Sequence, residues 1–342
     1  MVSEGGLERG HPMKPTITYR KRRDLALKKF SAPAIVSVLA EALRSSGIVL
    51  AAALGRPCEV KKEKLIGYLL FAKLCGDVYE QMELNSELYL QRHYDHSAFQ
   101  YHYTALSCNV ILQLTSLLEQ RIKHLTNEIL LHIFDSTALS TSVREERIRQ
   151  GTRNKEKLTN KFHTMLGYDP PFQLVVVEGM LASDNHTSDA NGAGSILKGK
   201  ENMKGYGFGD AAFETYDFID LTLEKNLQPI FKPTKKDVGR KLSAKAQLRK
   251  VWNGNHSRMY KDVKGSGECL YGGATRAGLI HTNSIRDDNR EKDSLIIGLR
   301  QNLFTYLRLK ALLELFENLG FPIKSQKPPV RDGWHDLIIT AN

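Results

Sequence analysis

The sequence predicts an α/β (α+β) layer architecture with an α-helical N-terminal region, and two observations lead to this fold class. Residues 31–132 carry apolar side chains at three- and four-residue spacings with charges between them, which is the period of amphipathic helices. Beyond Asp135 the helical spacing of apolar residues gives way to strand-like runs. The β-branched run in "PPFQLVVVEGM" (170–180) predicts a buried strand. Strand-like and helix-like segments alternate from there on, as they do in layered α/β proteins.

The N-terminal part is predicted to be helical throughout its apolar region. Residues 61–75 and 109–133 show the helical spacing most clearly. A short helix that includes 95–106 either docks on DNA or packs against its neighbours. The basic cluster at 19–29 is either a flexible tail or solvated helix face, or a DNA contact. We therefore assign residues 1–130 to a helical, DNA-binding region.

The second part is predicted to contain the sheet. The polar, Gly-containing stretch 181–195 is typical of a turn region, and 211–226 has the pattern of an amphipathic helix. A short strand is expected at 227–233, and a long helix at 289–320, closed by a Gly and a nearby Pro. The expected domain ranges are 131–320 for a catalytic domain and 321–342 for a C-terminal tail.

Composition favours a polyanionic partner. Lys and Arg total 49 against 38 Asp and Glu, a net charge of +11, so nucleic acid is expected first and an anionic membrane surface second.

The four cysteines lie far apart, which argues against a zinc finger and a disulfide framework. Glu41 and Arg44 interrupt the most apolar stretch, and the N-terminus has no apolar signal core. A cytoplasmic location is expected.

Asp135 is the first candidate site residue, because it ends the apolar run of "NEILLHIFDSTAL". An ionised carboxylate at the end of a buried strand is costly unless it is paired. Either it accepts backbone hydrogen bonds in a turn, or it is a metal ligand at the rim of a sheet.

Asp210 has a similar setting in "GYGFGDAAFETY". The glycines at 205, 207 and 209 form neither GxGxxG nor a Walker motif, and are expected to let the backbone turn tightly. Asp210 is then either a helix cap, where a carboxylate is favoured, or a second acid of the same site.

The order "FDST…KFH…VVEGMLASDNHTSD…GDAAFETYDFIDLTLEKNLQPIFKP" resembles DDE-type insertion-sequence transposases over roughly residues 85 to 315. Asp135 with Ser136 and Thr137, Lys161 with His163 at a strand start, and the "GDAAF" segment carry the resemblance. It implies a ribonuclease-H-like mixed sheet flanked by helices. It also implies three catalytic, metal-binding carboxylates, of which Asp135 would be the first and Asp210 the second.

The third acid of the family lies in a signature of Tyr, Arg, Glu and Lys, whose closest match here is "YKDVKGSGECLYGGATR". By resemblance Glu268 is the third carboxylate, but two gaps are one residue too long, and Gly272 and Gly273 are expected to interrupt the helix. The competitor is Glu291, whose simpler role is a charge partner at a helix N-terminus. The other signature positions would be Tyr260, Lys264 and Arg276.

The resemblance implies two Mg²⁺ (or Mn²⁺) ions. Such ions, about 3.5–4 Å apart, activate the attacking oxygen and stabilise the leaving oxygen in phosphodiester cleavage. Hard oxygen ligands suffice, so no His or Cys is required. On this reading Asp135 bridges the ions, while Asp210 and Glu268 each complete one. His163, His186 and His281 are expected to be structural or DNA-facing.

A DNA contact is predicted for residues 225–264, where basic residues greatly outnumber acids and two aromatic residues could stack on an unpaired base. A solvated basic face is the alternative. The predicted DNA-binding residues are Lys235, Lys236, Arg240, Lys241, Lys245, Arg249, Lys250, Trp252, Tyr260, Lys264 and Arg276.

Together these features predict a DNA transposase that cleaves element ends and joins them to target DNA. Its partner would be double-stranded DNA and not a membrane. By resemblance it would assemble on DNA as a homodimer, in the cytoplasm and associated with the nucleoid of a prokaryote-like cell. The alternative is a transposase-derived DNA-binding protein without catalytic activity.

Overall fold

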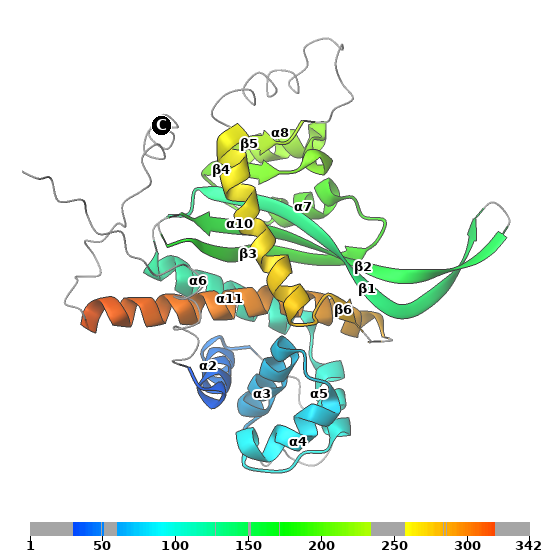
Figure 1. Ribbon diagram of the computed structural model, residues 1–342, viewed down its shortest axis with the longest axis vertical. Coiled ribbons are helices and arrows are strands. Elements are labelled where there is room, and N and C mark those ends of the chain that lie inside the picture. The colour runs from blue at the N-terminus through cyan, green and yellow to red at the C-terminus, as the bar shows by residue number, and fades with distance from the viewer. Residues whose placement is uncertain are drawn as a thin grey trace, which may run out of the picture.

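The computed structural model describes residues 30–48, 50, 60–126, 128–149, 152–170, 172–233, 257–282, 284 and 286–318. A twisted sheet lies at the centre, with helices on both faces and a group of N-terminal helices at one end (Figure 1). The basic cluster at 19–29, the tail at 321–342 and most of the basic segment 225–264 lie outside the described residues.

The N-terminal region is helical, as the apolar spacing predicts. Its helices are α2 (Ala32–Ser45), α3 (Lys62–Cys75), α4 (Tyr79–Leu90), α5 (His96–Ala105) and α6 (Cys108–Leu125). Side-chain caps begin two of them: the Asp95 carboxylate accepts from the backbone N–H of Ser97, and the Ser107 hydroxyl accepts from Asn109. Gly76 ends α3 in the left-handed conformation, with φ of 88°.

The sheet is mixed and has six strands. They are β1 (Leu131–Arg149), β2 (Thr152–Asp169), β3 (Leu174–Asp184), β4 (Gly205–Gly209), β5 (Leu227–Phe231) and the short β6 (His281–Thr282). The order is β3-β2-β1-β4-β5, and β6 pairs with β1. β1, β2 and β3 are antiparallel neighbours, whereas β4 and β5 join β1 in parallel. The predicted α/β class is confirmed at this level.

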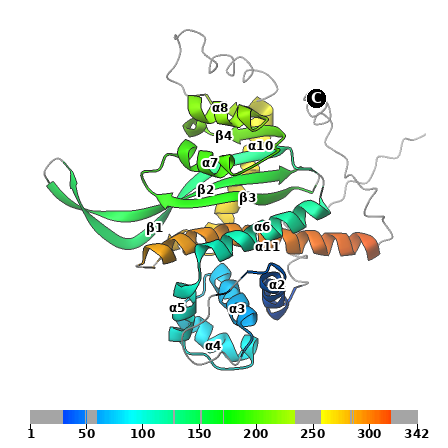
Figure 2. The same ribbon diagram turned by 180° about the vertical axis from the view of Figure 1, so that it is seen from behind.

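Helices cover the two faces of the sheet, and the alternation of side chains along β1 shows which face meets which helix. Ile133 belongs to the core that includes Val263 and Leu270 of α10 (Ser257–Arg276), which crosses the sheet in Figure 1. The next residue, Phe134, points to the opposite face, where it packs with residues of α7 (Asp189–Lys198), of the 3₁₀ turn η1 (Ala211–Phe213) and of α8 (Tyr216–Glu224) (Figure 2).

The long helix α11 (Asp287–Asn318) joins the N-terminal helices to the sheet. Asn302 is fully buried, and its side-chain N–H donates to the carbonyls of Val177 in β3 (2.8 Å) and Thr115 in α6 (3.0 Å). Lys292 donates to three carbonyls at the end of α5, those of Tyr103, Thr104 and Leu106. Buried residues of the helical region and of the sheet form one continuous core across the boundary predicted near residue 130.

Five local expectations are wrong in whole or in part. Asp135 does not end a strand, because β1 continues to Arg149, and Lys161 and His163 lie inside β2 rather than at its start. The glycines of 205–209 form strand β4 and not a turn. The stretch 181–195 has its turn at 185–187, but it also contains the end of β3 and the first turns of α7. Gly272 and Gly273 do not interrupt α10, since packing of Leu270 and Ala274 into the core outweighs the cost of glycine in a helix.

Candidate active site

Asp135 and Asp210 are brought together by the pairing of β1 with β4. The parallel register sets Leu131 opposite Tyr206 and Ile133 opposite Phe208. Continued by two residues, it sets Asp135 opposite Asp210, which follows the last residue of β4. Neighbouring strands are about 4.8 Å apart, so the two carboxylates share one edge of the sheet. The charge of Asp210 contributes to a raised pKa at Asp135.

Asp210 also caps the turn that follows it. Its carboxylate Oδ1 accepts a hydrogen bond of 2.9 Å from the backbone N–H of Ala212, at the start of η1. The capping role considered from the sequence is therefore confirmed. The cap engages only this oxygen and orients the carboxylate, so Asp210 can cap the turn and also lie beside Asp135 as a second acid. Asp135 and Asp210 are called the acidic pair below.

Asp135 lies on the α10 face of the sheet and is ion-paired there. Its Oδ2 is 3.0 Å from Nζ of Lys264, and both side chains are only 14% exposed. Its Oδ1 accepts from the backbone N–H of Ser136 (3.0 Å). Burial raises the pKa of Asp135, and the Lys264 ammonium opposes that rise. Lys264 is thus the counter-charge that makes a largely buried carboxylate tolerable.

Helix α10 presents three residues of the expected signature at four-residue intervals, which places Tyr260, Lys264 and Glu268 on one side of the helix. Burial raises the pKa of Tyr260 to about 12, and the charges of Asp210, Asp135 and Glu268 add to the rise. The charges of all three predicted acids therefore act on this phenol. Glu268 itself is exposed.

Two contacts fix α10 against the strands. The Tyr271 hydroxyl and the Thr164 hydroxyl are hydrogen-bonded at 2.8 Å, and Thr164 is the cross-strand partner of Asp135. Gly267 permits the close approach, because a Cβ at this position would lie 3.2 Å from Cγ2 of Ile133. The helix that carries Glu268 is therefore held directly over the strand that carries Asp135.

Glu291 lies elsewhere. It sits in the first part of α11 beside the Cys108 thiol at the start of α6, and burial, with the Glu291 charge adding to it, raises the pKa of Cys108 to about 11. The apolar residues expected behind it, Leu295, Leu299 and Leu303, are buried in the core. Glu268 thus lies on the helix that crosses over Asp135, whereas Glu291 lies beside Cys108 on α11.

The remaining predicted residues divide between described and undescribed parts of the chain. Arg276 is exposed at the end of α10, two turns beyond Glu268. Buried His163 bonds the Ser183 hydroxyl, and His281 bonds the Ser140 hydroxyl at the edge of β6. The other predicted DNA-binding residues lie outside the described residues; these are Lys235, Lys236, Arg240, Lys241, Lys245, Arg249, Lys250 and Trp252.

A fourth acid, Asp189, was not singled out from the sequence. It begins α7 on the other face of the sheet, where its carboxylate is 2.6 Å from Nζ of Lys161 and accepts a short hydrogen bond from the Ser136 hydroxyl. Burial opposes its ionisation, but the bonds from Lys161 and Ser136 outweigh burial and lower its pKa. The only signal in the sequence was the "TSD" cap before a helical run, which many helices share.

Asp135, Asp210 and Glu268 offer carboxylate oxygens, the ligands that Mg²⁺ prefers. Their oxygen atoms are not gathered closely around one point. In the part of the chain that the structure describes, one trio of potential ligands has donor atoms all within 4.8 Å of one another: Glu83, Asp95 and His96, of which two are exposed. Asp135, Asp210 and Glu268 are less tightly grouped, with Lys264 among them.

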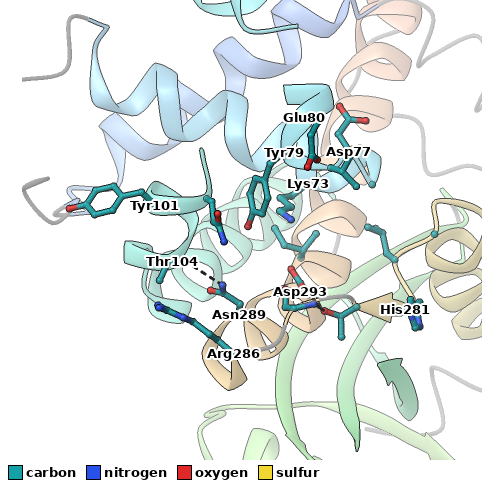
Figure 3. A pocket seen from close by; sticks show the side chains of 18 of the residues that line it. Lys73, Asp77, Tyr79, Glu80, Tyr101, Thr104, His281, Arg286, Asn289 and Asp293 are labelled. Atoms are coloured by element: carbon teal, nitrogen blue, oxygen red, sulfur yellow. Dashed lines mark hydrogen bonds between the residues drawn. The ribbon is translucent and has the colours of Figure 1, made fainter. Parts of the chain in front are cut away.

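A separate pocket of about 830 Å³ lies between the N-terminal helices and α11 (Figure 3). Its cations and acids are mixed, and Asp293 already accepts hydrogen bonds from the hydroxyls of Tyr103, Thr282 and Ser284. The Lys73 ammonium lies over the rings of Tyr79 and Tyr103. None of the predicted acids lines this pocket, and His281 does.

No protein-family model and no curated protein matches the chain. In the described part of the chain, no helix has the length and apolar character needed to cross a membrane.

Proposed function

We propose that the chain is a DNA transposase that cleaves element ends and joins them to target DNA by two-metal phosphoryl transfer, with a ribonuclease-H-like catalytic core. The observation that carries the proposal is the adjacency of Asp135, in β1, and Asp210, directly after the parallel strand β4, under a helix that holds Glu268. The mixed sheet, in which β1, β2 and β3 are antiparallel and β4, β5 and the short β6 run parallel to β1, is compatible with such a core. On this proposal the protein acts in the cytoplasm, as a homodimer on double-stranded DNA.

Asp135, Asp210 and Glu268 are the residues that would hold the metal. When bound, two Mg²⁺ (or Mn²⁺) ions supply an activated oxygen nucleophile and stabilise the leaving oxygen. The chain itself supplies the anionic cradle and the cap that orients Asp210. Tyr271 and Thr164 keep α10 in place above the strands. The basic residues of 225–264 bind the phosphates on either side of the cleaved bond.

A transposase-derived DNA-binding protein without catalysis is the second candidate. The ion pair between Lys264 and Asp135 favours it, because an ammonium already balances the carboxylate that would bridge the ions. The open grouping of the three acids favours it too. A purely DNA-binding descendant would keep its basic surface and lose strand cleavage.

Strand nicking distinguishes the two candidates. The purified chain is incubated with duplexes taken from the DNA that flanks its coding sequence, with Mg²⁺, with Mn²⁺ or with a chelator, and binding is measured in parallel by gel shift. The transposase is expected to nick at a defined position only when a divalent ion is present. Binding without nicking in either metal supports the second candidate, and absence of binding overturns both.

A further inference from the structure

The pocket between the N-terminal helices and α11 has the size and the position of a small-molecule site. Its volume of about 830 Å³ lies within the usual range of about 300–1,000 Å³ for such sites. The start of α4 and helix α5 form one side of it, and β6 with the start of α11 forms another (Figure 3). Junctions between two parts of a fold are common places for bound molecules.

The wall of the pocket is held in place by its own contacts. The Asp293 carboxylate accepts hydrogen bonds from the hydroxyls of Tyr103 and Thr282. The Lys73 ammonium lies 4.3 Å from the ring centre of Tyr79 and 4.7 Å from that of Tyr103. These contacts connect α3, α5, β6 and α11, so a molecule that binds here has few protein side chains to order, and the entropic cost of binding is low.

One polar atom in this wall has no partner. Asn289, in the first turn of α11, is only 8% exposed, and its side-chain N–H donates to the Thr104 hydroxyl at 3.4 Å. Its Oδ1 is buried and accepts no hydrogen bond from the residues that the structure describes. An unsatisfied buried acceptor is costly, and buried polar groups of folded proteins are nearly always paired. The Asn289 carbonyl therefore suits an N–H or O–H donor of a bound molecule.

The charges around the pocket argue against a strongly charged ligand. Two basic and three acidic residues line it, so its net charge is −1 with histidine neutral. The acids would repel a phosphate-rich anion. Lys73 would repel a cation, and it already lies over the two tyrosine rings that could attract one. The ligand is therefore a molecule without net charge that carries both hydrogen-bond donors and acceptors.

The aromatic residues of the pocket favour a flat ring system. Tyr79 lines the pocket, and so does Tyr101, whose side chain is 45% exposed. An exposed aromatic side chain beside a polar pocket offers a face on which a heterocycle can stack. Ring N–H or amino groups of a heterocycle can donate to Asn289, and a ring carbonyl or ring nitrogen can accept from Lys73.

We propose that this pocket binds a nucleobase or its uncharged nucleoside, with the heterocycle stacked beside Tyr101 and hydrogen-bonded to Asn289. Ser97 and Gln100 of α5 add a hydroxyl and an amide that suit the hydroxyls of the sugar. The inference goes beyond the proposed function and does not depend on it, because neither member of the acidic pair lines the pocket. A bound nucleoside joins α5 to α11 and so raises the unfolding midpoint of the chain.

Calorimetric titration of the full chain with adenosine, cytidine, adenosine monophosphate and tryptophan tests this assignment. The nucleosides are expected to bind at one site per chain, and the monophosphate more weakly than adenosine. Asn289→Leu removes the unpartnered acceptor at similar volume, and we expect it to weaken nucleoside binding by about tenfold. Asn191→Leu, at an exposed position of α7, is the matched control and should bind as the unaltered chain does.

Unfolding without ligand shows whether Asn289 serves binding or structure. Removal of a buried acceptor without a partner should leave the unfolding midpoint of Asn289→Leu unchanged or higher. If this variant does not fold, Thr104→Val decides, because it removes only the hydroxyl that holds the Asn289 amide and should weaken binding several-fold.

The affinities decide between the outcomes. Weaker nucleoside binding in the pocket variant alone supports the inference, whether or not the chain nicks DNA. The same nucleoside affinity in the pocket variant and the unaltered chain overturns it, and so does the absence of binding by either nucleoside. Binding of tryptophan or of the monophosphate without binding of a nucleoside shows that the pocket takes another class of molecule, and the inference is then wrong.

Discussion

Lys264 of α10 and Asp135 of β1 form an ion pair of 3.0 Å, and this contact joins the helix that carries Glu268 to the strand that carries the first acid. One ammonium stands against three nearby carboxylates, so the ionised group keeps a net negative charge. Repulsion by the Asp210 carboxylate is one cause of the raised pKa of Asp135. A divalent cation would relieve it more completely than Lys264 can.

The first prediction concerns Asp135 and Asp210. Asp135→Asn or Asp210→Asn removes a negative charge but keeps a side-chain oxygen that can accept from Ser136 or Ala212. We expect nicking to fall by at least about a thousandfold, which corresponds to about 4 kcal/mol of lost transition-state stabilisation. DNA binding should stay nearly intact. Rates come from a plasmid-nicking time course, with Asp217→Asn, in the exposed first turn of α8, as the control. Normal nicking by Asp210→Asn would remove it from the site.

The sequence singles out the candidate acids Asp135 and Asp210, but it does not predict the bounds of the strands beside them. Asp135 and Asp210 could be found because each follows an apolar or glycine-rich run. Their adjacency could not, since it depends on a parallel register between segments far apart in the chain. The end of β1 and the start of β2 were missed because charged residues at 144–157 do not alternate with apolar ones, which is the signal that a half-buried strand gives.

Local propensity misled the prediction where packing decides the structure. Gly272 and Gly273 each cost helix stability, yet α10 continues through them because Leu270 and Ala274 are buried on either side. The sequence does not single out Asp189, because its surroundings also depend on packing. A capping residue has the same sequence signature whether it faces water or pairs with Lys161 beside a candidate site.

The second prediction concerns the basic segment 225–264. Neutralising Lys235, Lys236, Arg240 and Lys241 together to Gln should weaken binding to all duplex sequences alike, because phosphate contacts carry no sequence information. If all four contact phosphates, the magnitude of the salt slope falls by about 3.6. Fluorescence anisotropy at several salt concentrations measures it, with one flanking and one unrelated duplex. An unchanged slope means that these residues form a solvated face and not a DNA contact.

The third prediction concerns stability at low pH. Glu178 is fully buried, and although burial opposes its ionisation, contacts with His132 (2.5 Å) and Lys123 (2.8 Å) lower its pKa to about 2. Its usual pKa is 4.5. A pKa that is lower in the folded state stabilises the protein above the unfolded value, and this stability is lost as the pH falls from 4.5 toward 2. The loss amounts to about 3 kcal/mol.

Urea unfolding between pH 6 and pH 3 measures this effect. The Glu178→Gln variant is expected to be less stable at pH 6 and to show a flatter dependence on pH than the unaltered chain. Glu128→Gln is the matched control, because Glu128 pairs with Lys204 at 3.4 Å on the surface and such pairs contribute about 0–1 kcal/mol. The same pH dependence in Glu178→Gln and in the unaltered chain would contradict the assignment.

The last prediction separates Glu268 from Glu291. Glu268 shares the surroundings of Tyr260 with Asp135 and Asp210, whereas Glu291 lies beside Cys108 near the start of α6. Glu268→Gln should abolish Mg²⁺-dependent nicking without loss of stability, because its side chain is exposed. Glu291→Gln should keep full nicking activity and cost about 0.3–1 kcal/mol, the usual contribution of an acid near a helix N-terminus.

Both variants are assayed for nicking and for unfolding in the same preparations, so that a folding defect is not taken for a catalytic one. The opposite pattern would require α11 to supply the third acid, which would mean that the chain rearranges on DNA and brings Glu291 away from Cys108. Full activity in both variants would leave Asp135 and Asp210 without a third carboxylate from either helix. In that case Asp189 is the next acid to replace, as Asp189→Asn, because its carboxylate accepts a hydrogen bond from the hydroxyl of Ser136, the residue that follows Asp135.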